Sequence, residues 1–349
     1  MKLSVIIVSY NVKYHLEQCI RSVRKASEAL DDDIWVVDNA SSVNSIGYLQ
    51  TLFPEIHYIC NTENVGFSRA NNQAIHQCEG EYVLLLNPDT IVAEDTLKGC
   101  VDFLDTHPEV GATGVRMLNA DGTFAPESRR GFPTPFVSFC KMTGLSDLFP
   151  KSPIFGRYYM KYLDENEANP IEVISGAFNM LRRKALDEVG LLDEDFFMYG
   201  EDIDLSYRLF TAGWKNYYLP YNILHYKGES TQKSSFRYVH VFYQAMLIFF
   251  NKHYKRKYLF IGYLIRLAVV FRASLDMLIR VFRKCSPLES KYEISYMRFD
   301  LRETSVTDML SALRNQKSCK NKMLSEVETL SYDGTMIIRH NEVLPLNEK

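Results

Sequence analysis

The sequence predicts an α/β fold built on a mostly parallel, doubly wound sheet. Three mainly apolar runs, at 4–8, 34–37 and 82–86, do not alternate with polar residues, which is typical of strands buried on both faces. Segments of helical character lie between and after these runs, at 15–29, 42–53 and 66–78. Strands that alternate with helices of this length indicate βαβ units, in which the strands are parallel and the crossovers right-handed.

Each apolar run gives way to polar residues at its carboxyl end. These are Ser9, Tyr10 and Asn11 after the first run, Asp38 and Asn39 after the second, and Asn87, Pro88 and Asp89 after the third. Pro88 cannot donate a sheet hydrogen bond, so the third strand should end there. A single polar end is as consistent with an ordinary turn as with a site. Three on one edge predict a ligand site, because open α/β sheets bind ligands at the carboxyl ends of their strands.

Composition narrows the class of protein. The 349 residues allow one large or two medium domains, and a net charge of -3 argues against a dedicated nucleic-acid binder. The seven cysteines are an odd number without C-x-x-C spacing, which favours reduced thiols in the cytoplasm. The first apolar run is too short for the core of a signal peptide, so we expect no export by that route.

Six sequence blocks together resemble a known family. They are Val8-Ser9-Tyr10-Asn11, Val37-Asp38-Asn39-Ala40-Ser41-Ser42, Asn64-Val65-Gly66-Phe67-Ser68-Arg69-Ala70-Asn71-Asn72, Leu86-Asn87-Pro88-Asp89-Thr90, Ser175-Gly176-Ala177-Phe178, and Phe196-Phe197-Met198-Tyr199-Gly200-Glu201-Asp202-Ile203-Asp204. In this order they resemble glycosyltransferase family 2, the inverting GT-A enzymes, and particularly its rhamnosyltransferase-like branch. The resemblance extends to about His225 and implies a GT-A fold.

The predicted donor site combines the strand ends with the helix that begins after Gly66. A carboxylate at Asp38 can accept the imide N–H of a pyrimidine, and the resemblance implies the same contact. Ser9 is placed to reach ribose or phosphate, and the helix start at Gly66 favours an anion. Arg69, one turn further, is expected to reach the diphosphate, although a solvated helix face is the alternative. The remaining predicted donor-binding residues are Tyr10, Asn11, Asn39, Asn72, Asn87 and Asp89.

A divalent cation, Mn²⁺ or Mg²⁺, is expected at Asp89. A lone carboxylate beside a hydroxyl at a strand end suits a cation that carries phosphate oxygens. Many GT-A enzymes have Asp-x-Asp, whereas this chain has Asn87-Pro88-Asp89. The resemblance implies His225 as the second ligand, and imidazole tilts the choice toward Mn²⁺. A lone histidine is otherwise more often structural.

The resemblance implies Asp202 as the catalytic base. Inverting transfer is a single displacement, in which the acceptor hydroxyl must lose its proton. Glu201 and Asp202 follow Gly200 at a predicted helix start, where acidic residues also serve as ordinary caps. Glu201, Gly176 and Arg129 are expected to support the site on its acceptor side.

The region after the resemblance predicts membrane contact. If 258–284 is a helix, its charged residues fall on one arc and the rest is apolar, which suits an interfacial helix on an anionic membrane. Packing against the protein's own core is the alternative. We therefore expect three parts: a GT-A domain at 1–235, an amphipathic helical region at 236–285, and a polar appendage at 286–349. The appendage has a helix-like piece around 307–314 and a strand-like piece at 335–339.

These observations predict a peripheral glycosyltransferase on the cytoplasmic face of the inner membrane. It would transfer L-rhamnose or another hexose from a dTDP- or UDP-sugar to a hydroxyl of a lipid-linked bacterial surface glycan. The alternative is a membrane-associated glycan-binding pseudoenzyme or scaffold that uses the fold without chemistry. A nucleotidyltransferase shares the sheet, but the glycine- and arginine-rich loop typical of that class does not follow Val8.

Overall fold

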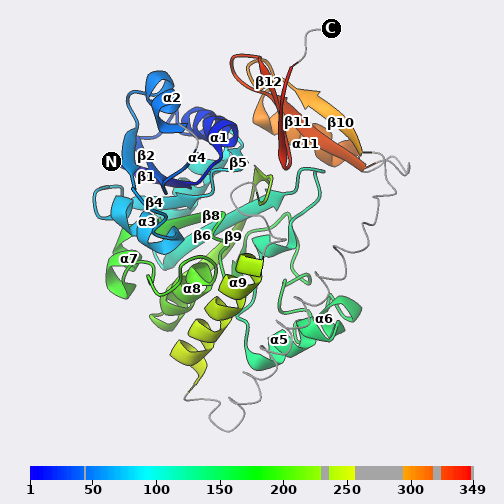
Figure 1. The fold of residues 1–349 in the computed structure, drawn as a ribbon. Helices are drawn as coiled ribbons and strands as arrows, with labels where there is room; N and C mark the ends of the chain where they lie inside the picture. The colour runs from blue at the N-terminus through cyan, green and yellow to red at the C-terminus, as the bar shows by residue number, and fades with distance from the viewer. Residues whose placement is uncertain (43–44, 229–235, 256–293, 317–323, 347–349) are drawn as a thin grey trace.

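A nine-stranded mixed sheet forms the centre of the computed structural model (Figure 1), which describes residues 1–42, 45–228, 236–255, 294–316 and 324–346. Its order is β3-β2-β1-β4-β8-β6-β9-β5, with β7 paired to β9. The strands are β1 Leu3–Ser9, β2 Asp32–Asp38, β3 His57–Cys60, β4 Tyr82–Leu86, β5 Thr90–Val92, β6 Val110–Leu118, β7 Asn169–Ile171, β8 Phe178–Arg182 and β9 Lys215–His225.

Six of these strands point in one direction. β1, β2, β3, β4, β6 and β9 run together, while β5, β7 and β8 run antiparallel to their neighbours. The predicted α/β class with a mostly parallel sheet is therefore confirmed. Parallel pairing also puts the ends of β1 and β2 in register, with Ser9 opposite Asp38.

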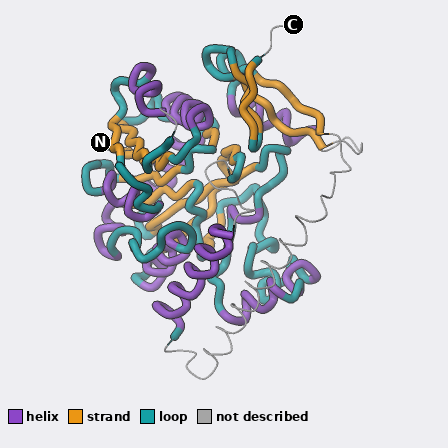
Figure 2. The backbone as a smooth tube through the Cα atoms, in the orientation of Figure 1, coloured by secondary structure: helices purple, strands orange, loops and turns teal. Residues whose placement is uncertain are grey.

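Helices cover both faces of the sheet (Figure 2). They are α1 Lys13–Ala26, α2 Ser45–Leu52, α3 Phe67–Ile75, α4 Thr96–Thr106, α5 Pro135–Met142, α6 Leu145–Leu148, α7 Arg183–Val189, α8 Glu201–Thr211 and α9 Phe236–Phe249, followed by a π-helical turn at Phe250–Tyr254. In β1, Val5 and Ile7 pack toward α1 and α4, whereas Ile6 and Val8 pack toward α3, α7 and α8. Burial on both faces explains why the apolar runs do not alternate.

The C-terminal end of the chain forms a small four-stranded sheet. Its strands, β10 Ile294–Phe299, β11 Leu324–Leu330, β12 Met336–Arg339 and β13 Glu342–Pro345, pair in that order beside α11 Val306–Gln316. The expected helix-like and strand-like pieces correspond to α11 and β12. The C-terminal end of the chain is therefore a small sheet and not a helical region; the helical region was expected at 236–285, of which the structure describes 236–255. Residues with positive φ at Gly334 and Asn341 permit the tight turns that build hairpins here instead of helices.

The small sheet packs against the main one. Met309, Leu310 and Leu313 of α11 are buried against Ile91 of β5 and Leu224 of β9. The carboxylate of Glu94 accepts hydrogen bonds from the amides of Val306 (2.8 Å) and Thr307 (3.0 Å) and so caps α11.

A polar seam also joins α1 to the small sheet. His15 Nε2 lies 3.2 Å from the carbonyl of Arg339, and the amide of Gln18 donates to Oγ1 of Thr329 at 2.5 Å. The hydroxyl of Tyr226 lies 3.3 Å from the same Thr329 oxygen. Burial of His15 in this seam lowers the pKa of its imidazole.

The amphipathic helix expected at 258–284 lies outside the described residues. The chain before it, in α9 and the following turn, is helical as expected. None of the helices in the described ranges combines the length and apolar character needed to cross a bilayer.

Candidate active site

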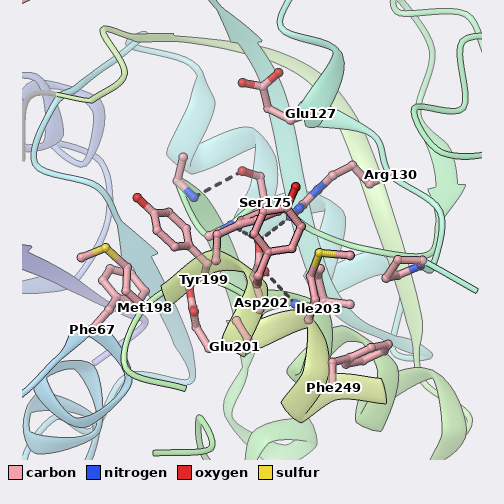
Figure 3. A pocket seen from close by; sticks show the side chains of 18 of the residues that line it. Phe67, Glu127, Arg130, Ser175, Met198, Tyr199, Glu201, Asp202, Ile203 and Phe249 are labelled. Carbon is pink, nitrogen blue, oxygen red and sulfur yellow. Dashed lines mark hydrogen bonds and ion pairs between the residues drawn. The ribbon is translucent and has the colours of Figure 1, made fainter. Parts of the chain in front are cut away.

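A cavity of about 950 Å³ opens at the carboxyl edge of β1 and β4 (Figure 3). The turn at 175–177, the start of α8, helices α5 and α9, the end of β9 and the loop that contains Arg130 also contribute to its wall. Eight of the residues predicted from sequence line it: Tyr10, Asn39, Asn87, Asp89, Gly176, Glu201, Asp202 and His225. Residues that are far apart in the sequence are therefore gathered around one space.

Asp89 and His225 form a buried pair on one side of this cavity. His225 Nε2 lies 3.3 Å from Oδ1 of Asp89 and 3.4 Å from the side-chain nitrogen Nδ2 of Asn87. Antiparallel pairing of β5 with β9, which puts Thr90 opposite His225, keeps the two side chains adjacent. Burial alone would raise the pKa of Asp89, but the charge and hydrogen bond of His225 lower it to about 2.

This pair fits a divalent cation as an incomplete set of ligands. An imidazole nitrogen and a carboxylate oxygen 3.3 Å apart can approach one ion together, and both groups line the cavity. Within the described ranges no group of three or more His, Cys, Asp or Glu side chains is placed to hold a metal. Any ion held here must therefore take its remaining ligands from substrate or water, as Mg²⁺ and Mn²⁺ commonly do with phosphates.

Asp202 is fixed at the start of α8 by three donors. Its Oδ1 accepts from the amide of Ile203 at 2.8 Å, and its Oδ2 accepts from the amide of Gly176 at 3.2 Å and from the guanidinium of Arg130. Arg130 also donates to the carbonyl of Ile174 at 3.2 Å. Burial alone would lower the pKa of Arg130, but the charge of Asp202 raises it.

The turn at 175–177 connects Asp202 to the Asp89–His225 pair. The amide of Asn87, directly after β4, donates to the carbonyl of Ala177 at 3.1 Å. The amide of Gly176, one residue earlier, donates to Asp202. One short turn thus holds a carboxylate suited to proton transfer beside a pair suited to a metal–diphosphate group.

Glu201 lies beside Asp202 but has different chemistry. It is 6% exposed, and among the described residues its Oε2 has no hydrogen-bond partner. Burial, together with the negative charge of Asp202, raises the pKa of Glu201 to about 8. At neutral pH Glu201 is therefore mainly protonated, and the pair of carboxyl groups carries less than its full negative charge.

The loop after β2 orients Asp38. Its carboxylate, which is 7% exposed, accepts from the amide of Ser41 (3.0 Å) and from the hydroxyl of the same residue (2.5 Å). Asn11 accepts from the amide and hydroxyl of Ser42, at 2.8 and 2.9 Å. The side-chain amide of Asn39 donates to the backbone carbonyl of Gly66 at 3.1 Å. Ser9 is buried at the end of β1, in register with Asp38. The polar ends of β1 and β2 are thus linked to each other and to the start of α3.

The start of α3 differs from the expected anion site. Gly66 has φ +88°, and a Cβ there would lie 2.7 Å from the carbonyl oxygen of Phe197. That carbonyl accepts the amide of Phe67 at 2.7 Å, so the amide already has a protein partner. Gly66 is required here for a close approach between two chain segments.

Seven of the predicted residues do not line the cavity: Ser9, Asn11, Asp38 and Gly66, described above, and Arg69, Asn72 and Arg129. Arg69 is exposed and pairs with Glu194 at 2.9 Å, while the amide of Asn72 donates to the carbonyl of Leu192 at 2.9 Å. Arg129 is buried away from the cavity, where it donates to the carbonyl of Leu163 at 2.7 Å. These contacts brace neighbouring loops.

The cavity residues that were not in the predicted set include Arg130, Lys227 and Glu127. Arg130 is adjacent to Arg129, and because successive side chains alternate in extended backbone, only one of the two can face the cavity. Lys227 and Glu127 form an ion pair across the lining, with 2.5 Å between Nζ and Oε1. Burial alone would raise the pKa of Glu127, but the charge of Lys227 lowers it. The sequence signal that could have identified Lys227 is its position two residues after His225.

Residues 4–190, more than half of the chain, match the sequence model of the glycosyl transferase family 2. The chain belongs to glycosyltransferase family 2. It is therefore a glycosyltransferase, and the predicted family is confirmed.

Two rhamnosyltransferases are similar to part of this sequence. The N-acetylglucosaminyl-diphospho-decaprenol L-rhamnosyltransferase of Mycobacterium tuberculosis is 28% identical over 259 residues, covering 71% of this chain and 83% of that protein. The rhamnosyltransferase WbbL of Escherichia coli is 27% identical over 197 residues, covering 50% of this chain and 70% of its own. Among solved structures, the mannosyltransferase PcManGT from Pyrobaculum calidifontis, in complex with GDP-Man and Mn2+, has a TM-score of 0.47 at 17% identity over 72% of this chain and 63% of that one. Family membership rests on the sequence match.

Proposed function

We propose that this protein is an inverting GT-A glycosyltransferase whose catalytic base is Asp202. The observation that carries the proposal is the placement of Asp202 and of the Asp89–His225 pair in the wall of one cavity, with the turn at 175–177 between them. A single displacement needs a base on one side of the sugar and stabilisation of a leaving diphosphate on the other. Both groups are present on opposite ends of one short turn.

The donor in this proposal is a pyrimidine nucleoside diphosphate sugar. Asp38, oriented by Ser41, accepts the imide N–H of the base, and Asp89 and His225 hold a divalent cation. When bound, the cation supplies positive charge that stabilises the departing diphosphate. Lys227, which lines the same cavity and pairs with Glu127, is a second basic residue available to the phosphates.

On the acceptor side, Asp202 takes the proton of the attacking hydroxyl. Gly176 and Arg130 fix Oδ2 of Asp202, so the carboxylate does not rotate away from the acceptor. Glu201, mainly protonated at neutral pH, limits the negative charge beside the base. In this proposal Asp202 lines the cavity as the base, and the buried guanidinium of Arg130 positions it.

The relatives support a choice of donor and acceptor. Two of them are named as rhamnosyltransferases, and one name specifies a diphospho-decaprenol acceptor. We therefore propose dTDP-L-rhamnose as the donor, with UDP-hexoses next, and a hydroxyl of a lipid-linked bacterial surface glycan as the acceptor. Such an acceptor would put the protein at the cytoplasmic face of a membrane.

Thermal unfolding with a panel of nucleotide sugars tests the donor. We expect dTDP-L-rhamnose, or failing that a UDP-hexose, to raise the Tm in Mn²⁺ more than in chelator, and GDP-mannose to have little effect. Release of the nucleoside diphosphate in the presence of a polyprenyl-diphosphate-linked sugar then tests turnover. Donor binding without release, under conditions where the acceptor also binds, would identify a glycan-binding pseudoenzyme and contradict the proposal.

A further inference from the structure

Large apolar side chains gather on one part of the surface, on α5, α6 and the loop that follows. Phe136, Phe139, Met142, Leu148, Phe149 and Ile154 form this apolar patch, and each is between 48% and 69% exposed. The other large apolar side chains exposed in the described ranges lie on other elements: Met1, Leu52, Phe210, Tyr296 and Tyr332. Scattered exposed side chains are normal, whereas a contiguous group marks a contact surface.

The geometry of α5 explains how the patch is built. Val137 and Cys140 face the protein and are buried, whereas Phe136, Phe139 and Met142 recur every third residue on the opposite face. A helix with apolar residues on both faces needs a second apolar environment outside the protein core.

Aromatic contacts hold the patch together as one surface. The ring of Phe155 lies 6.3 Å from that of Phe136 and 5.5 Å from that of Phe149, measured between ring centroids. α5 and α6 lie together at one side of the molecule, away from the central sheet (Figure 1). The patch is therefore a connected surface on the outside of the fold.

Positive charge accompanies the patch. Residues 135–161 contain four basic side chains and one acidic side chain, a net charge of +3 by formal count, while the whole chain has -3. Lys141 and Lys161 both pair with that acidic residue, Asp147, at 3.1 Å, and Lys151 is exposed. Apolar side chains bordered by lysines suit the boundary between acyl chains and anionic headgroups.

The patch continues into the active-site cavity. Phe139 and Met142 are about half exposed and also line the cavity that contains Asp202. Whatever covers the patch therefore lies beside the entrance for the acceptor. On α9, Phe242 and Met246 extend the apolar lining.

We propose that the apolar patch on α5 and α6 docks on an anionic lipid bilayer and that the cavity opens toward that bilayer. The proposal rests on the proposed function, because a lipid-linked acceptor explains why an apolar surface should adjoin the base. The patch side chains enter the acyl boundary, the lysines contact headgroups, and the acceptor glycan reaches Asp202 along Phe139 and Met142. This surface lies within 136–154, whereas the interfacial helix expected at 258–284 lies outside the described residues.

Co-sedimentation of the full chain with phosphatidylcholine vesicles, with or without phosphatidylglycerol, tests this docking. The variant Phe136→Ser/Leu148→Ser/Ile154→Ser removes patch side chains that do not line the cavity, and we expect its bound fraction on anionic vesicles to fall about five-fold or more. The control Leu52→Ser/Tyr332→Ser removes exposed apolar side chains elsewhere and should bind as the wild type does. dTDP binding should be unchanged in both, which separates docking from the donor site.

A fluorescence measurement keeps the test independent of other membrane contacts. Tryptophan introduced as Leu148→Trp should be quenched by vesicles with brominated acyl chains, whereas Tyr332→Trp should not. Wild-type vesicle binding by the triple variant together with an unquenched Trp at 148 would overturn the docking. Loss of self-association in the triple variant, with vesicle binding unchanged, would assign the patch to a second copy of the chain and also overturn it. If the protein fails to bind any nucleoside diphosphate, the proposed function fails instead.

Discussion

The guanidinium of Arg130 donates to Oδ2 of Asp202, and both side chains line the cavity. The same oxygen accepts the amide of Gly176, while Oδ1 accepts the amide of Ile203. The carboxylate proposed as the base is therefore held by one side chain and two backbone groups. An acceptor hydroxyl must bind next to an oxygen whose direction is already set.

The first prediction concerns the base. Asp202→Asn keeps the size of the side chain but cannot accept the acceptor proton. We expect the rate of sugar transfer to fall by ~10²-fold or more, with the Kd for the nucleoside diphosphate nearly unchanged. Steady-state kinetics with calorimetric titration measures both. Transfer at the wild-type rate would exclude Asp202 as the base.

The second prediction concerns the buried ion pair. Arg130→Ala leaves Asp202 without its cationic partner, so we expect the free energy of unfolding to fall by about 3 kcal/mol. Asp202→Ala/Arg130→Ala removes both charges and should recover part of that loss. Urea unfolding of the two single variants and the double variant gives the coupling energy. Additive losses would mean that the two residues are not energetically coupled.

The third prediction concerns the metal pair. Asp89→Asn removes the charge that attracts a cation, so Mn²⁺ should no longer strengthen the binding of dTDP or UDP. A nucleoside without phosphates should bind as it does to the wild type. Calorimetric titration in Mn²⁺ and in chelator measures this. Equal diphosphate affinity in both conditions for the wild type would rule out the metal.

The fourth prediction concerns pH. The pKa of Glu201 in the folded protein is about 8, above its ordinary value of 4.5, so the folded state binds more protons than the unfolded state between these values. Stability should therefore fall as pH rises through this window, with a total change on the order of a few kcal/mol. Glu201→Gln removes this dependence and should be the more stable form at alkaline pH.

Urea unfolding between about pH 5 and about pH 8 measures the slope in the wild type and in Glu201→Gln. The exposed Glu79→Gln is a matched control, since it removes a carboxyl group that is not buried. It should keep the slope of the wild type. An unchanged slope in Glu201→Gln would show that another group is responsible.

Much of the fold followed from local pattern. The unalternated runs predicted β1, β2 and β4 because both faces of these strands are buried, and the polar residues after them predicted one edge of the sheet. Asp89 and His225, far apart in the sequence, meet because β5 pairs with β9. The resemblance implied that pair, since strand pairing at this separation leaves no local signal.

The contacts of single side chains were beyond reach of the sequence. Arg129 and Arg130 have the same chemistry, and only the direction of the extended backbone decides which one faces Asp202. The helix start at Gly66 was expected to leave backbone amides free for an anion. The amide of Phe67 instead donates to the carbonyl of Phe197, which lies 131 positions after Gly66. The small C-terminal sheet depends on turns at Gly334 and Asn341. Because this part of the chain is mostly polar, its strands had no clear apolar pattern in the sequence.

The seam that joins α1 to the small sheet has a practical consequence for dissecting this enzyme. Tyr226, which contacts Thr329, directly follows His225, and His15 contacts the carbonyl of Arg339. A truncation that ends the chain before β11 would remove residues that pack behind the Asp89–His225 pair, although every proposed catalytic residue would still be present. A shortened protein that has lost activity would thus report a missing support and would say nothing about which residues perform the chemistry.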